Sequence, residues 1–281
     1  MKKILSLILA AAMLSACAPQ KSGEDKLTVY ASFYAMYDFA REIGGDKIEL
    51  VSMVPTGAEP HDYEPSARDM AKLHDADIFI YNGHGMEEWA ESVADTLPDT
   101  VEVICLSGSG TGEQSGGDPH TWLNLENARD GYEKIYEAFL AADEKNADYY
   151  RVNYEKAAAE TEKLINEYNA ASLEGKTIYV THAAYGYLCD EFGMKQVSLE
   201  GIYGESDPTP SRLAEVVNAI KEGGAKCIFY DPLEGDKIAA SVAEEAGVSV
   251  SPLYTFEGDE ENRSYAEVMR ANLEALNGGV N

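Results

Sequence analysis

Three of the five histidines in this sequence lie in segments typical of divalent metal sites. The segments are GAEPHDYEP around His61, DPHTWL around His120 and THAAYGYL around His182. Neutral imidazole is the common nitrogen ligand of zinc, and three such ligands leave one position of a tetrahedral site to fill. Because the three histidines lie far apart in the sequence, no two of them share a helix face. A site built from them would be assembled by the tertiary fold, in a cleft.

The other polar candidates carry weaker signals. His74 falls on the polar side of a short predicted helix and is interpreted as a surface residue. His84 follows a predicted strand in a glycine-flanked turn, where it is either structural or an accessory to the metal site. Asp231 ends another predicted strand, and we expect it either to hold a ligand imidazole in its metal-binding tautomer or to cap the following helix.

The N-terminus has the pattern of a bacterial lipoprotein signal. It combines a short basic start, an apolar run over 4–13 that is too short to span a bilayer comfortably, and LSAC at 14–17. We therefore predict a lipoprotein signal peptide over 1–16, lipid on the sulfur of Cys17, and a polar tether over 17–26. Acyl chains on Cys17 would anchor the protein to the lipid bilayer of the cell membrane on its extracytoplasmic side. The alternative is an ordinary signal peptide with an incidental cysteine.

The sequence is strongly acidic, with a formal charge of −28 at pH 7. A negative surface of this kind repels nucleic acid and anionic lipid headgroups and attracts cations. We therefore expect no nucleic-acid partner. The charge also serves solubility alone, so it does not by itself define a metal site. We expect the protein to be a monomer.

Predicted strands alternate with predicted helices in both halves of the chain. The strands are predicted at 26–31, 48–54, 76–81 and 101–106 in the first half, and at 177–181, 196–199, 227–230 and 249–254 in the second. Such alternation is typical of parallel sheets with helices on both faces. A low-complexity segment over 107–117 precedes the His120 segment and predicts a mobile loop.

Between the two halves, residues 143–171 contain no proline or glycine and repeat apolar residues at helical spacing. Roughly 28 helical residues at about 1.5 Å each give a rod of about 40 Å. We therefore predict an α/β fold in which two α/β lobes with parallel sheets, over 27–140 and 176–281, are joined by one long rigid helix.

In this order and spacing, the segments resemble those of the metal-binding solute receptors of ABC importers for zinc and manganese. The resemblance covers essentially the whole mature chain. The matching segments are the lipoprotein signal, GAEPHDYEP, YNG at 81–83, DPHTWL, THAAYGYL and IFYD at 228–231. The resemblance implies that His61 and His120 from the N-terminal lobe and His182 from the C-terminal lobe bind a metal ion in the cleft between the lobes. It also implies delivery of that ion to the membrane permease of an ABC importer.

The third histidine bears on the choice of metal. Receptors for manganese commonly carry a carboxylate at the position of His182, whereas imidazole suits zinc, so we expect Zn²⁺. The fourth ligand of the family is an Asp or Glu in the loop after the last strand, a position that falls on Tyr254. Glu257 lies three residues further on and is our predicted fourth ligand, with Glu59 or water as alternatives.

Three other functions remain open on the sequence alone. A manganese receptor of the same family would use the same residues. A metal-dependent hydrolase would need an open coordination position and a general base beside it, and the sequence has no His-Glu-x-x-His pair. An adhesin is neither supported nor excluded by an acidic surface.

Overall fold

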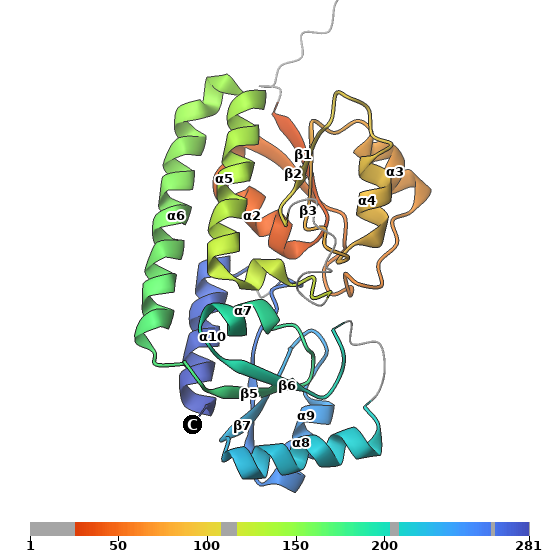
Figure 1. Cartoon of the computed structure of the whole chain (residues 1–281). Coiled ribbons are helices and arrows are strands. Elements are labelled where there is room, and N and C mark those ends of the chain that lie inside the picture. Colours follow the sequence, from red (N-terminus) through yellow and green to blue (C-terminus); the bar gives the residue numbers. More distant parts are fainter. Residues whose placement is uncertain (1–25, 108–116, 203–207, 260–261, 281) are drawn as a thin grey trace, which may run out of the picture.

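The computed structural model describes residues 26–107, 117–202, 208–259 and 262–280. The predicted signal peptide with Cys17 and most of the predicted loop at 107–117 lie outside these ranges. Within them the chain forms two α/β lobes, one above the other in Figure 1, with long helices along one side. No helix within the described ranges combines the length and the apolarity needed to cross a bilayer.

The N-terminal lobe is built on a four-stranded parallel sheet in the order β2-β1-β3-β4. Its strands are β1 (Leu27–Ala31), β2 (Ile48–Ser52), β3 (Ile78–Tyr81) and β4 (Glu102–Cys105). Its connecting helices are α2 (Tyr34–Gly44), α3 (Ala67–Leu73) and α4 (Glu88–Ala94). Every residue of β3 is buried, as expected for a central parallel strand covered on both faces.

The C-terminal lobe repeats this arrangement with the strand order β6-β5-β7-β8. Its strands are β5 (Thr177–Val180), β6 (Lys195–Ser198), β7 (Cys227–Tyr230) and β8 (Ser249–Pro252). Its connecting helices are α7 (Gly186–Glu191), α8 (Pro210–Gly223) and α9 (Lys237–Ala246). In both sheets the second strand of the lobe lies at one edge, followed by the first, the third and the fourth.

The helical stretch between the lobes is divided in two. Helix α5 (Leu125–Ala142) pairs with α6 (Ala147–Ala170), and a 3-10 turn over Glu144–Asn146 separates them. The long helix therefore begins four residues later than predicted. The reason is Asp143, whose carboxylate accepts hydrogen bonds from the side chains of Asn146 (2.7 Å) and Tyr150 (2.9 Å). Asp143 takes a non-helical conformation there (φ −142°, ψ 68°) and ends α5 without a proline or glycine.

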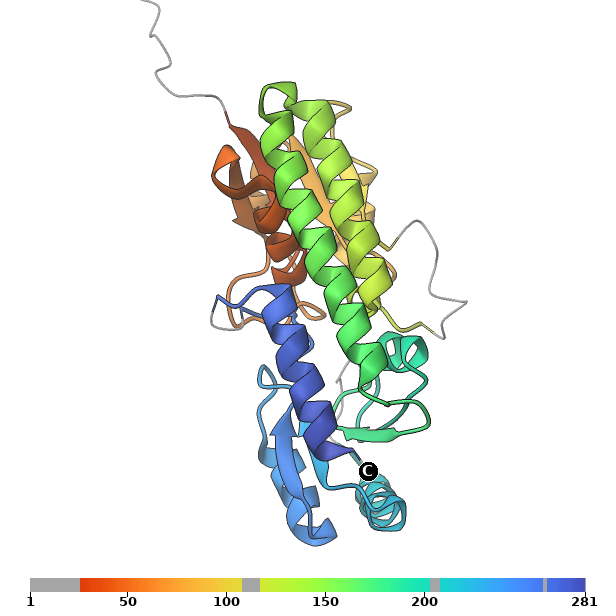
Figure 2. The same ribbon diagram turned by 90° about the vertical axis from the view of Figure 1, so that its left-hand side faces the viewer.

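The last helix, α10 (Tyr265–Gly279), forms a second link between the lobes that the sequence did not indicate. It runs beside α6 in Figure 2, and the Tyr168 hydroxyl of α6 donates to the Met269 carbonyl at 2.7 Å. At its first turn the Tyr265 amide donates to Asp38 of α2 at 2.9 Å, and the Tyr265 hydroxyl donates to the Trp122 carbonyl at 2.6 Å. Two helices, not one, therefore fix the lobes against each other.

The main apolar core continues across the lobe junction. Phe39 of the N-terminal lobe packs edge-on against Tyr265, with ring centroids 5.1 Å apart, and Phe256 packs in the same way against Tyr34 at 5.2 Å. Because this core excludes water from the junction, polar groups buried in it must find partners there. The junction contains the three histidines singled out by the sequence.

Candidate metal centre

His61, His120 and His182 converge at the junction of the lobes. Each offers a ring nitrogen that lies within 4.8 Å of the nitrogens offered by the other two. The Nε2 atoms of His61 and His120 are 3.3 Å apart. In a tetrahedral zinc site with bonds of about 2.0 Å, neighbouring ligand atoms lie about 3.3 Å apart. The fold thus sets these two nitrogens at the separation that a shared zinc ion would need.

His61 lies in the loop between β2 and α3, beyond the carboxyl end of a parallel strand, where α/β folds bind ligands. Its backbone amide donates to the Glu59 carboxylate at 3.3 Å. Burial lowers the pKa of His61 to about 4, so the imidazole is neutral at pH 7. The neutral form is the one that binds a metal ion.

His120 is fully buried and its ring is held by the residue two positions before it. The Asp118 carboxylate accepts both the backbone amide of His120 (3.0 Å) and its Nδ1–H (2.8 Å). This pairing places the proton on Nδ1 and turns the Nε2 lone pair to the centre. Burial opposes protonation of His120, but hydrogen bonds to Asp118 and Glu257 outweigh it and raise the pKa of this imidazole.

The segment that carries His120 is itself fixed by Asn82, which follows β3. The Asn82 side chain donates to the Pro119 carbonyl at 2.8 Å and accepts from the Thr121 hydroxyl at 2.7 Å. The buried Glu87 carboxylate in turn accepts a hydrogen bond from the backbone N–H of Asn82 at 3.0 Å. The two loops at the carboxyl end of the N-terminal sheet are therefore one hydrogen-bonded unit.

His182 follows β5 and is buried on the side of the C-terminal lobe. Its Nδ1 lies 3.2 Å from the Glu234 carboxylate and its Nε2 lies 2.6 Å from the Ile202 carbonyl. Burial opposes protonation, but the Glu234 hydrogen bond and the charge of Glu257 outweigh it and raise the pKa of His182 to about 10. Binding a metal through either nitrogen exchanges one of these two contacts for the ion.

A buried carboxylate completes the cluster. Glu257 lies in the loop after β8, and its Oε1 is 3.1 Å from the Nε2 of His120, again close to the edge of a tetrahedral site. Burial opposes ionisation of Glu257, but the three imidazoles outweigh it and lower the pKa of the carboxyl. Burial and the charge of Glu257 raise the pKa of Glu59, which favours its neutral form. Tyr254 instead packs its ring against the Arg263 guanidinium, 4.4 Å from the ring centroid.

Other candidate residues take structural positions. His84 has a left-handed backbone (φ 63°), and its Nε2 lies 3.2 Å from the Tyr187 hydroxyl across the junction. His74 is exposed at the end of α3. Neither role expected for Asp231 is seen: its carboxylate accepts the backbone amides of Leu233 (2.7 Å) and Thr255 (3.0 Å), and α9 begins only after Asp236.

Sequence reasoning missed the carboxylates that hold the imidazoles, Asp118 and Glu234. Asp118 had a local signal, because a carboxylate two residues before a histidine in an Asp-Pro-His turn can fold back onto the ring. Glu234 had none, because it meets His182 only through the packing of two strands in the C-terminal sheet.

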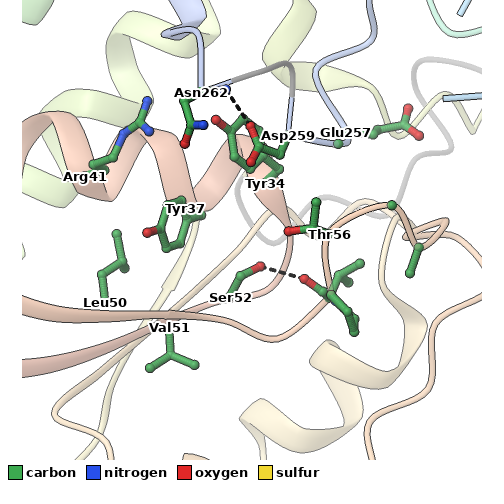
Figure 3. A pocket seen from close by; sticks show the side chains of 15 residues that line it. Tyr34, Tyr37, Arg41, Leu50, Val51, Ser52, Thr56, Glu257, Asp259 and Asn262 are labelled. Carbon is green, nitrogen blue, oxygen red and sulfur yellow. Dashed lines mark hydrogen bonds between the residues drawn. The ribbon is translucent and has the colours of Figure 1, made fainter. Parts of the chain in front are cut away.

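A cavity of about 390 Å³ lies on the other side of Glu257. Tyr34, Tyr37, Arg41 and Asp259 line it, and Figure 3 shows the Glu257 carboxylate pointing away from it. A guanidinium on the wall disfavours a metal cation there. None of the three histidines lines the cavity, which is therefore distinct from the histidine cluster.

Two α/β lobes with parallel sheets, joined by long helices around an imidazole and carboxylate cluster, define the class of two-lobed metal-binding receptors. The chain belongs to the ZnuA family, described as "Zinc-uptake complex component A periplasmic", whose profile matches residues 29–279.

The relatives agree with this assignment. The chain is 31% identical over 277 residues to the "High-affinity zinc uptake system protein ZnuA" of Bacillus subtilis, covering 90% of this chain and 87% of that protein. The Zn(II)-bound ZnuA-like domain of Streptococcus pneumoniae AdcA is similar in structure (TM-score 0.79, 30% identity, 90% of this chain and 98% of that domain). So is the laminin-binding protein Lmb of Streptococcus agalactiae (TM-score 0.81, 34% identity, 90% and 98%). The predicted family and the two-lobed α/β fold are confirmed.

Proposed function

We propose that the protein captures extracytoplasmic Zn²⁺ between its lobes and delivers it to the permease of an ABC importer. The proposed ligands are His61, His120, His182 and Glu257. One observation carries the proposal: three imidazoles meet in a buried junction, and the Glu257 carboxylate lies beside one of them. The nitrogens of His61 and His120, and the His120 nitrogen and Glu257 oxygen, are separated by about the edge length of a tetrahedral zinc site. Membership of the ZnuA family and the Zn(II)-bound structure of the AdcA domain support it.

The chemistry of the donor set favours zinc over manganese. Three nitrogen donors and one oxygen donor suit tetrahedral Zn²⁺, whereas Mn²⁺ prefers more oxygen donors and a higher coordination number. The low pKa of Glu257 keeps one negative charge at the centre, which partly neutralises the divalent cation. A neutral Glu59 beside it would be a weaker fourth donor than the ionised Glu257.

Hydrolysis is a poorer account of the same residues. A catalytic zinc site keeps one position open for the water that attacks the substrate. Here Glu257 would occupy the fourth position, so the centre would be closed. The relative Lmb is described as "a bifunctional protein with adhesin and metal transporting activity". In this chain the buried histidine cluster favours the metal role.

The site of action follows from the N-terminus. We propose that Cys17 is lipidated and that residues 17–26 tether a monomeric receptor to the membrane, so that the permease lies within reach. The family description places these proteins in the periplasm, which agrees with an extracytoplasmic receptor.

Metal competition tests the proposed function directly. The purified mature protein is titrated with Zn²⁺ and Mn²⁺ against a chromophoric chelator, together with Glu257→Gln and the exposed control Glu244→Gln. We expect zinc to bind more tightly than manganese, Glu257→Gln to weaken zinc binding, and Glu244→Gln to leave it unchanged. Equal affinity for the two metals would contradict the assignment, and full zinc affinity in Glu257→Gln would remove Glu257 from the ligand set.

A further inference from the structure

Asp231 joins two loops of the C-terminal lobe that are far apart in the sequence. It follows β7 and is almost completely buried, at 2% exposure. One carboxylate oxygen accepts the Leu233 amide at 2.7 Å and the other accepts the Thr255 amide at 3.0 Å. Each oxygen therefore holds a different loop.

Both loops end at the metal centre. Leu233 directly precedes Glu234, whose carboxylate lies 3.2 Å from His182 Nδ1. Thr255 lies two residues before Glu257, whose carboxylate lies 3.1 Å from His120 Nε2. A shift of Asp231 would therefore move Glu234, which contacts the proposed ligand His182. It would also displace Glu257, which is itself a proposed ligand.

The second of these loops needs an external anchor. Between Thr255 and Glu257 lies Phe256, a buried non-glycine residue with a left-handed backbone (φ 65°). Such a conformation is disfavoured for a bulky side chain and persists only where its surroundings fix it. Asp231 holds the Thr255 amide, and the Trp122 indole N–H donates to the Thr255 carbonyl at 2.7 Å. Thr255 is thus held from both lobes directly before the strained residue.

We propose that Asp231 is a positioning residue that sets the coordination geometry of the zinc centre from outside it. It does so by fixing, with one carboxylate, the loop of Glu257 and the loop of Glu234. The inference rests on the proposed zinc-binding function and adds to it a residue that does not touch the ion.

The chemistry of the side chain explains why a carboxylate is needed. Two backbone amides point at Asp231, so two acceptor oxygens are required. Asparagine has the same shape but only one acceptor, and its NH₂ group would face a second N–H donor. Asp231→Asn therefore releases one loop with little change in volume, whereas Asp231→Glu keeps both acceptors.

The test compares zinc affinities of the mature protein by chelator competition. Loss of a partner that orients a ligand typically weakens metal binding roughly ten- to a hundredfold, and we expect this for Asp231→Asn. We expect Asp231→Glu to bind zinc more tightly than Asp231→Asn. The matched control is Asp236→Asn, an exposed aspartate in the same loop without a side-chain cap hydrogen bond, which should be unchanged.

A double-mutant cycle separates positioning from general stability. If Asp231 acts through Glu257, the loss in Asp231→Asn with Glu257→Gln should be smaller than the product of the two single losses. The visible spectrum of the Co²⁺-loaded Asp231→Asn protein should also change, because the bands report coordination geometry. A merely structural role would lower the melting temperature and leave that spectrum unaltered.

The outcomes distinguish this inference from the proposed function. Unmutated protein that does not bind zinc would overturn the proposed function. Normal zinc binding by the unmutated protein, together with unchanged affinity in Asp231→Asn or with single losses that simply multiply, would overturn the positioning role alone.

Discussion

His120 on the N-terminal lobe and His182 on the C-terminal lobe are both buried, yet their imidazoles are held differently. Asp118 holds Nδ1 of His120, and the partners of Nε2 are His61 and Glu257, which are themselves proposed ligands. Both nitrogens of His182 have partners in its own lobe, Glu234 and the Ile202 carbonyl. The N-terminal lobe therefore holds its imidazoles beside other proposed ligands, while His182 must exchange a contact with a group that is not a ligand for its bond to the ion.

This difference assigns distinct tasks to the two lobes. The hydrogen-bonded unit of Asn82, Asp118 and His120 forms a rigid half-site that needs little rearrangement on binding. Because His182 already has hydrogen-bond partners that it must give up, its bond to zinc contributes less to the free energy of zinc binding. A weaker bond between His182 and zinc would help a receptor that must release its ion, because release can begin by breaking that single bond.

The largest expected effect on zinc affinity comes from removing a ligand of the N-terminal lobe. Zinc binding of about 10–16 kcal/mol shared by four ligands gives about 3 kcal/mol for each, so His120→Ala should weaken binding a few hundredfold. In His182→Ala the exchanged contact, worth about 1.5 kcal/mol, offsets about half of that loss, so zinc binding should weaken roughly tenfold. Chelator competition measures both, with the exposed His74→Ala as control. Equal losses would contradict the comparison.

The pH dependence of zinc affinity should reveal the proton carried by His182, in addition to any released by His120, whose pKa is also raised. His61, with a pKa of about 4, is already neutral at pH 6–8, whereas His182, with a pKa of about 10, must lose a proton to bind. Since zinc displaces that proton, affinity should rise with pH by about tenfold per unit for each proton released. Dissociation constants at pH 6, 7 and 8 measure the slope. His182→Gln should flatten it by about one proton, and an identical slope in that variant would show that the proton comes from elsewhere.

The sequence was sufficient for what depends on local pattern. The strand and helix alternation predicted both sheets, and the proline-flanked histidine segments identified His61 and His120 before their packing was known. The spacing of apolar residues does not say what a helix packs against. The link from α10 to Asp38, 227 residues away in sequence, could therefore not be predicted.

The loop after β8 shows the same limit more sharply. Counting along the chain put Tyr254 at the family's carboxylate position, and Glu257 was predicted as the fourth ligand with Glu59 and water left open. In the structure the left-handed backbone of Phe256 helps decide which side chain faces inward, and it is Glu257 that lies beside His120. A positive φ at a phenylalanine carries no sequence signal, since glycine is the usual residue there.

Exchanging the donor atom at position 182 should alter the preference between zinc and manganese. His182→Glu replaces a nitrogen with a charged oxygen donor, which suits manganese better than zinc. We expect the preference for zinc over manganese to narrow by about tenfold, with most of the change in the zinc affinity. Competition of the two metals in the same sample measures it, and Tyr187→Phe, which keeps His182, serves as the control. A preference that widens would show that His182 is not a metal ligand.

The smallest expected effect concerns the distance between the lobes. Bending α6 would break its i to i−4 hydrogen bonds, and α10 adds a second link through Tyr168 and Tyr265. Zinc binding should therefore move the His182 side locally and leave the overall dimensions nearly unchanged. Small-angle X-ray scattering with and without zinc should give the same radius of gyration within error, while hydrogen exchange should slow around His182 more than around His120. A clear compaction on zinc binding would mean that the two helices act as a hinge. The whole C-terminal lobe, and not only the surroundings of His182, would then move.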